Sequence, residues 1–163
     1  LAELTSNLAR YDGIKYGTTK DGGTLSMVYS NSRSAGFMDE NKRRILIGNY
    51  VLSSGYYDAY YQKAQTVRTL LIREFTNAFE TVDILISPTA PTPAFKLGEN
   101  TADPLQMYMA DMMTVPASLA GLPTVSVPMG TTGAGLPVGL QLMAPMRRDD
   151  IILSAAKIWE ELA

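Results

Sequence analysis

Residues 39–79 read DENKRRILIGNYVLSSGYYDAYYQKAQTVRTLLIREFTNAF, and this stretch decides the fold class of the chain. Asp39 suits a helix N-cap, and an acidic residue follows it where the positive end of the helix dipole lies. Apolar and aromatic residues then recur at three- and four-residue steps to the end of the stretch. This spacing predicts a long amphipathic helix, bent near Gly48 or Gly55.

Short apolar segments follow that helix and are typical of strands. Residues 82–87 form an apolar run stopped by Pro88, which fits a buried strand that enters a loop. Residues 124–127 and the alternating residues 138–142 predict two further strands. The glycine-rich segment 130–136 between them favours a hairpin.

Further helices are predicted at 103–113, at 116–121 and at 149–162, from proline and acidic residues at their starts and glycine at the end of the second. Residues 1–35 are polar and glycine-bearing, so we expect loop there, with a short helix around 27–32. Helices therefore alternate with short apolar strands. The predicted class is α/β, with helices packed on a mixed sheet.

The composition is that of a globular protein, and it excludes several kinds of site. With 163 residues the chain suits one domain, and its net charge of -2 argues against a surface built to bind nucleic acid. No apolar run approaches the roughly 20 residues of a membrane span, and no secretory leader is evident, so we expect a cytoplasmic protein without membrane contact. The first residue is Leu1, which indicates a piece of a longer protein.

Two residue types are missing, and their absence limits the chemistry. The chain has no cysteine and no histidine. A Ser-His-Asp triad, a Cys-His pair and a histidine- or thiolate-ligated metal site are therefore excluded within it. Ser53-Ser54-Gly55 has the look of a nucleophile motif, but small residues on a helix packing face explain it better.

Arg44 and Asp111 are the candidate binding residues. On a helix Arg44 shares a face with Gly48, so it points toward the packed side, where a guanidinium needs an internal carboxylate or an anionic ligand as partner. Asp111 lies among four methionines, and such a carboxylate is either a buried structural cap or a ligand for a cation. Together, the guanidinium of Arg44 and the carboxylate of Asp111 could bind the carboxylate and ammonium ends of an α-amino acid. The tyrosines at 56, 57, 60 and 61 are expected to pack in the core or at its rim.

Eight segments together carry a resemblance to a known family. They are NLARYDGIKYG (7–17), SRSAGF (32–37), KRRI (42–45), LSSGYYDAYYQKAQTVR (52–68), PTAPTPAF (88–95), DPLQMYMADMMT (103–114), LAGLPTVSVPMG (119–130) and GLPVGLQL (135–142). On these motifs the chain resembles the amidase signature family, and within it the branch formed by the A subunits of bacterial aspartyl/glutamyl-tRNA amidotransferases. The motifs cover nearly the whole chain in the expected order.

The resemblance implies the division of roles. The family's Ser, cis-Ser and Lys lie in a GGSSGGS-type stretch that this sequence lacks, so residues 1–163 are expected to be the C-terminal portion of the amidase signature domain, without catalytic residues of their own. Arg44 is implied to hold the α-carboxylate of glutamine, and Asp111 its α-ammonium. Ammonia would pass to subunits B and C, which would use ATP and magnesium to amidate Glu-tRNA(Gln) or Asp-tRNA(Asn), with tRNA contacting this chain only indirectly. No cofactor is expected here. The alternatives are the C-terminal part of a different amidase, or a non-catalytic assembly module.

Overall fold

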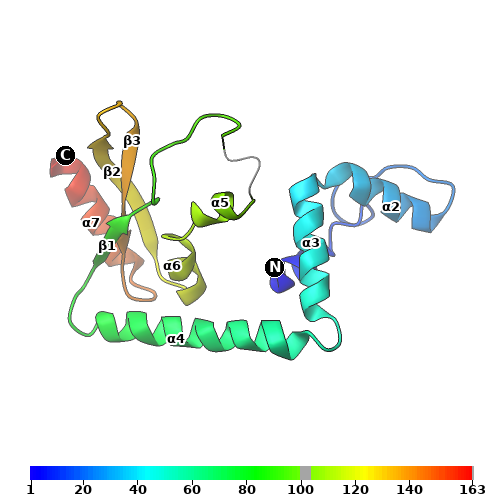
Figure 1. Ribbon diagram of the computed structural model, residues 1–163, viewed down its shortest axis with the longest axis horizontal. Coiled ribbons are helices and arrows are strands. Elements are labelled where there is room, and N and C mark those ends of the chain that lie inside the picture. The colour runs from blue at the N-terminus through cyan, green and yellow to red at the C-terminus, as the bar shows by residue number, and fades with distance from the viewer. Residues whose placement is uncertain (100–103, 163) are drawn as a thin grey trace. The chain divides into compact units, whose positions relative to one another are not determined.

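The computed structural model describes residues 1–99 and 104–162, and the chain divides into two compact units, Leu1–Thr66 and Val67–Ala163 (Figure 1). Within the described residues, no helix is long and apolar enough to cross a membrane. The α/β class predicted from the sequence is confirmed, because helices of both units accompany a three-stranded sheet in the second.

The first unit is helical. Its elements are α1 (Ala2–Leu8), α2 (Leu25–Gly36), α3 (Asp39–Leu52) and the π-helical segment η1 (Tyr57–Gln62). The sequence predicted a loop where α1 lies, and a shorter helix than α2. Thr24 caps α2 by accepting a hydrogen bond from the Met27 amide at 3.3 Å, which satisfies one of the unpaired donors of the first turn.

Helix α1 packs against α3 at Gly48. The Thr5 hydroxyl donates to the Ile45 carbonyl at 3.1 Å, and Gly48 is buried beneath the same contact. A Cβ at position 48 would overlap Thr5 Oγ1 and lie 2.5 Å from the Leu1 carbonyl oxygen. The space beside Gly48 is therefore filled by α1.

The long helix predicted over residues 39–79 is interrupted. Helix α3 ends before Ser53, whose hydroxyl donates to the Tyr50 carbonyl at 2.6 Å. Gly55 adopts φ +86°, a conformation that L-residues rarely take. Of the two glycines considered, Gly55 makes the break, and Ser53 and Ser54 lie in the connection instead of on a helix face. The helical path resumes in η1 and continues as α4 (Lys63–Ala78).

The second unit contains the sheet. Strands β1 (Leu85–Pro88), β3 (Pro137–Met143) and β2 (Thr124–Thr131) lie in the order β1-β3-β2, and both pairs are antiparallel. The predicted hairpin of β2 and β3 is confirmed, with an irregularity between Pro128 and Gly130. The mixed sheet that was expected would need parallel neighbours, and the described strands form an antiparallel part only.

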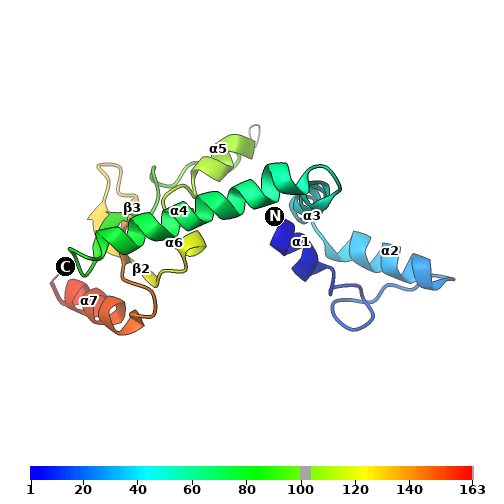
Figure 2. The ribbon, with the colours of Figure 1, turned by 90° about the horizontal axis from the view of Figure 1, so that it is seen from below.

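One face of this sheet is apolar and packs on α7 (Asp149–Leu162), which Figure 2 shows beside β2. The indole N–H of Trp159 ties the two together by donating to the Pro128 carbonyl at 2.7 Å. Ile158 and Leu162, predicted on the apolar side of this helix, are 58% and 81% exposed. The buried core consists of Val127, Leu140, Leu142, Ala144, Ile152 and Ala156.

Two short helices, α5 (Pro104–Met109) and α6 (Val115–Ala120), complete the second unit. The helix predicted over 103–113 ends at Met109, and its predicted N-cap Asp103 lies outside the described residues. From residue 110 the backbone amides bond three residues back, as in a tight turn. Pro116 contributes to this break. In a continuous helix its ring would clash with the carbonyl of Met112, four residues earlier, and it has no amide N–H to donate to that carbonyl. Gly121 ends α6 at φ +73°, as the sequence predicted.

Candidate functional site

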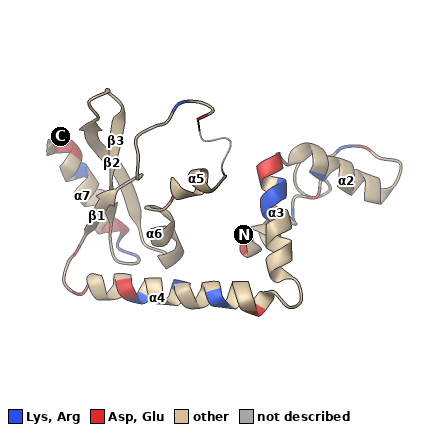
Figure 3. Cartoon of the chain, viewed as in Figure 1, with Lys and Arg blue, Asp and Glu red and all other residues tan. Residues whose placement is uncertain are grey.

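Arg44 lies on α3, one turn after a carboxylate. Its Nε donates to Glu40 Oε1 at 2.9 Å, and Arg43 Nη1 lies 3.2 Å from Glu40 Oε2. Figure 3 shows these acidic and basic residues gathered in the first turns of the helix. Of the two partners that the sequence analysis allowed for Arg44, the structure contains the internal carboxylate.

The contact between Arg44 and Glu40 leaves Arg44 able to bind a ligand. The Arg44 side chain is 40% exposed and that of Glu40 44%. A half-exposed pair of this kind contributes less than about 1 kcal/mol, because water and salt screen it. A carboxylate that binds the planar guanidinium with two parallel hydrogen bonds can therefore compete with Glu40 for it.

Asp111 lies in the connection 110–114 between α5 and α6, with its side chain exposed. Its carbonyl accepts hydrogen bonds from the amides of Thr114, at 3.1 Å, and Val115, at 3.0 Å, so its backbone closes the turn. The buried cap considered in the sequence analysis is thus wrong, and an exposed carboxylate suits a cationic ligand. Neighbouring Met107, Met109 and Met112 are also exposed, so they do not fill a core in this structure.

Arg44 belongs to the first unit and Asp111 to the second. Each is described by the structure in its own surroundings. Their joint use on one ligand remains a prediction from the sequence.

A residue that the sequence analysis did not single out anchors the segment around Asp111. Gln141 on β3 is 3% exposed, and its Nε2 donates to the Met113 carbonyl at 3.1 Å and to Ser87 Oγ at 3.4 Å. The signal in the sequence is a polar residue between Leu140 and Leu142, in a strand that is otherwise apolar.

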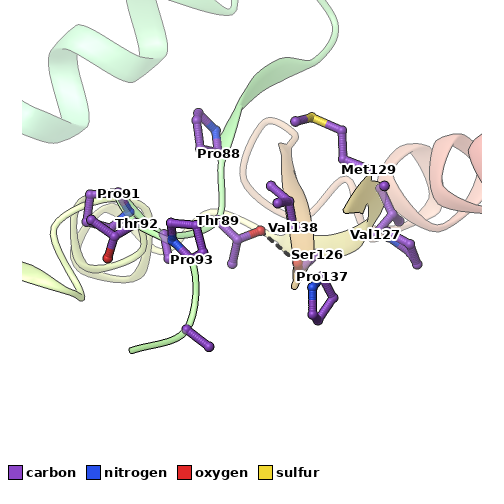
Figure 4. A pocket seen from close by; sticks show the side chains of 15 residues that line it. Pro88, Thr89, Pro91, Thr92, Pro93, Ser126, Val127, Met129, Pro137 and Val138 are labelled. Atoms are coloured by element: carbon purple, nitrogen blue, oxygen red, sulfur yellow. Dashed lines mark hydrogen bonds between the residues drawn. The ribbon is translucent and has the colours of Figure 1, made fainter. Parts of the chain in front are cut away.

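A groove of about 640 Å³ lies between the proline-rich segment 88–94 and strands β2 and β3 (Figure 4). Thr89 Oγ1 and Ser126 Oγ lie 2.7 Å apart across it, and the Thr89 amide donates to the Gly139 carbonyl at 3.0 Å. A Cβ on Gly139 would lie within 2.8 Å of both hydroxyl oxygens, so only glycine leaves room for this pair. Among the described residues that line the groove there is no lysine and no carboxylate. In this structure the two hydroxyls are hydrogen-bond partners of each other.

Of the tyrosines predicted to pack in the core or at its rim, Tyr61 is partly buried and lies against Tyr57 with ring centroids 5.0 Å apart, whereas Tyr56 and Tyr60 lie at the surface beside Tyr50. Tyr50 and Tyr56 stack with ring centroids 4.3 Å apart, and Tyr60 lies about 6 Å from both. The hydrogen bond between the Tyr50 and Tyr56 hydroxyls raises the pKa of Tyr50 above its ordinary value, with burial and the nearby Tyr60 adding to the effect. All three rings are 40–51% exposed.

Comparison with known proteins identifies the family. The family model described as Amidase matches residues 1–153. The chain belongs to the amidase family. The resemblance found in the sequence motifs is thereby confirmed.

Curated relatives are more than half identical to this chain over nearly its whole length. The A subunit of glutamyl-tRNA(Gln) amidotransferase from Synechococcus sp. (strain RCC307) is 57% identical over 163 residues, 99% of this chain and 34% of that protein. The protein of the same name from Geobacter metallireducens is 55% identical over 98% of this chain and 33% of its own length. The chain thus spans about a third of the length of these relatives.

Solved structures show the same fold. The A subunit of glutamyl-tRNA(Gln) amidotransferase from Thermotoga maritima is 39% identical, with a TM-score of 0.58 over 78% of this chain and 29% of that one. An allophanate hydrolase from Kluyveromyces lactis has a TM-score of 0.65 over 96% of this chain and 22% of that one, at 18% identity, and so shows likeness of fold alone.

Proposed function

We propose that this chain is the substrate-recognising portion of the glutamine-hydrolysing A subunit of a tRNA-dependent amidotransferase, which converts Glu-tRNA(Gln) or Asp-tRNA(Asn) to Gln-tRNA(Gln) or Asn-tRNA(Asn). The observation that carries this proposal is 57% identity, along 99% of the chain, to a protein named for that subunit. Solved structures with other names, among them an allophanate hydrolase and an aryl acylamidase, are 18–26% identical to it.

In this proposal the chain binds glutamine and supplies no nucleophile. Arg44 binds the α-carboxylate in place of Glu40, and Asp111 binds the α-ammonium. A serine from outside this chain attacks the side-chain amide of that glutamine. The described residues contain no cluster of three or more acidic side chains that could hold a metal ion.

The released ammonia passes to subunits B and C in the cytoplasm. ATP and magnesium act in the partner subunit, this chain needs no cofactor, and tRNA touches it only indirectly. Exposed apolar side chains on α4, such as Val67 and Leu70 at 49% and 51%, are consistent with burial against other parts of a larger assembly.

The test is ammonia release from glutamine and from propionamide, measured on a full-length protein that contains this segment. Losing one desolvated charge contact costs about 2–5 kcal/mol, so Arg44→Ala and Asp111→Ala should each lower kcat/KM for glutamine by roughly 30-fold or more. Propionamide has neither charged group, and its hydrolysis should be unchanged.

Arg43→Ala is the matched control, because Arg43 shares Glu40 with Arg44 but has no assigned ligand. Arg43→Ala should leave kcat/KM for both glutamine and propionamide unchanged. Equal losses on glutamine and propionamide would indicate a folding defect. Hydrolysis of propionamide but not glutamine by the unmodified protein would instead favour a different amidase, and no activity on either would favour an assembly module.

A further inference from the structure

Gln141 fixes the position of the turn that carries Asp111. We infer that Gln141 is a positioning residue for glutamine recognition, which holds Asp111 where the α-ammonium of the substrate binds. The inference rests on the proposed function, since it assigns Gln141 a role through Asp111.

Gln141 is placed at the centre of the sheet by strand pairing. It lies on the middle strand, opposite Ser87 on β1 and Ser126 on β2. A carboxamide has two N–H donors on one nitrogen, and here that nitrogen contacts both Ser87 Oγ and the Met113 carbonyl. Because the side chain is almost fully buried, the plane of its amide is set by these two contacts.

The hydrogen bond to Met113 controls Asp111 through a short, closed turn. Met113 is two residues beyond Asp111, and the Asp111 carbonyl accepts from both Thr114 and Val115. The backbone from 111 to 115 is thus held as one piece, and fixing the Met113 carbonyl fixes the Cα of Asp111. Without that bond the exposed carboxylate would keep its charge but lose its defined position.

A second contact holds α6, the helix that follows this turn. Arg68 Nε on α4 donates to the Leu119 carbonyl at 2.7 Å, next to the end of α6. Gln141 is the anchor nearer to Asp111, and it attaches the turn directly to the sheet. Burial of a polar side chain is unfavourable unless its hydrogen bonds are made. A leucine like those on either side would satisfy packing, so the amide is explained by the turn that it holds.

The experiment compares Gln141→Met with Trp159→Phe in the full-length protein. Methionine keeps the length of the side chain and removes its donors. Trp159→Phe removes a similar bond, one side-chain N–H to a backbone carbonyl, from the opposite face of the same sheet. Gln141→Met should raise KM for glutamine about tenfold, because the Met113 carbonyl loses the hydrogen bond that holds the turn, with kcat and propionamide hydrolysis unchanged. Trp159→Phe should leave KM unchanged.

A double variant separates positioning from general stability. If Gln141 acts through Asp111, Gln141→Met should add nothing to the KM of an Asp111→Ala variant. Additive effects, an unchanged KM for glutamine, or equal losses on propionamide would overturn the inference. If Gln141→Met does not fold, Gln141→Glu serves instead, because its carboxylate can accept a hydrogen bond from the Ser87 hydroxyl but cannot donate one to the Met113 carbonyl. Loss of propionamide hydrolysis in both variants would mean a structural role.

The two proposals fail differently. If Asp111→Ala leaves KM for glutamine unchanged, the proposed function fails at this residue, and the positioning role fails with it. If Asp111→Ala weakens glutamine binding and Gln141→Met does not, only the positioning role is lost.

Discussion

Gly48→Ala should loosen the packing of α1 on α3 in the first unit. The added methyl group would overlap Thr5 Oγ1, lie 2.5 Å from the Leu1 carbonyl oxygen and lie 2.8 Å from Thr5 Cβ. Two of these three atoms are backbone or Cβ, which cannot rotate away. Helix α1 must therefore move, and the hydrogen bond from Thr5 to the Ile45 carbonyl is lost with it.

The net change in the stability of α1 combines two destabilising effects and one stabilising effect. Overpacking of this kind costs about 1–3 kcal/mol. The lost hydrogen bond adds about 1 kcal/mol, and alanine's better helix propensity returns about 1 kcal/mol. We expect α1 to be destabilised by about 2 kcal/mol, which corresponds to a roughly 30-fold larger equilibrium constant for local opening of α1.

Amide hydrogen exchange of α1 in the full-length protein measures this directly, since local opening sets the exchange rate. Gly36→Ala is the matched control: Gly36 ends α2, has no positive φ, and a Cβ there would meet nothing within 4 Å. It should leave exchange in α1 unchanged. If Gly48→Ala exchanged no faster than this control, the close approach of α1 at Gly48 would be refuted.

Three further changes test the second unit. Gly121→Ala places a side chain at φ +73° and should lower the free energy of unfolding by about 1 kcal/mol in denaturant titrations; no change would contradict the left-handed cap. The hydrogen bond from Arg148 holds the pKa of the Asp150 carboxyl below its usual value, so Arg148→Ala should raise that pKa in a carbon-13 titration. The lowered pKa of Asp150 stabilises the fold at neutral pH, and that stabilisation is lost as the pH falls through the folded-state pKa, so Arg148→Ala should lose less stability in acid than the unmodified protein. An unchanged pKa of Asp150 in the variant would refute the hydrogen bond from Arg148. Trp159→Phe should cost about 1 kcal/mol of stability through its lost bond to Pro128, and an unchanged unfolding midpoint would argue against that bond.

The sequence predicted most of the second unit because its signals are local. Alternation over 138–142, glycines over 130–136 and acidic residues at the start of α7 each lie within a few positions of the element they specify. Gly121 as a helix end was predicted for the same reason. The end of α5 was not, because the break depends on Pro116 and on the bond from distant Gln141 to Met113.

The first unit was predicted less well, for the opposite reason. Helix α1 has seven residues, too few to be stable alone, and it is ordered by contacts about forty positions away, such as that of Thr5 with Ile45. The same contact explains why Gly48 had to be glycine. The sequence left Gly48 and Gly55 as equal candidates for a bend; the structure separates them, because Gly55 has a left-handed φ whereas Gly48 lies within α3 under the close contact with α1.

The candidate site shows the same limit in chemical terms. Arg44 and Asp111 were found because a charge in an apolar setting must have a partner, and that rule needs only their own neighbours in the sequence. Gln141 is neutral, and its importance comes from one carbonyl 28 positions away. A charged group that binds substrate can thus be proposed from the sequence, whereas the group that positions it emerges only when the strands are paired. The double variant at Gln141 and Asp111 tests this relation, because loss of a positioning contact should cost nothing further once the charge that it positions has been removed.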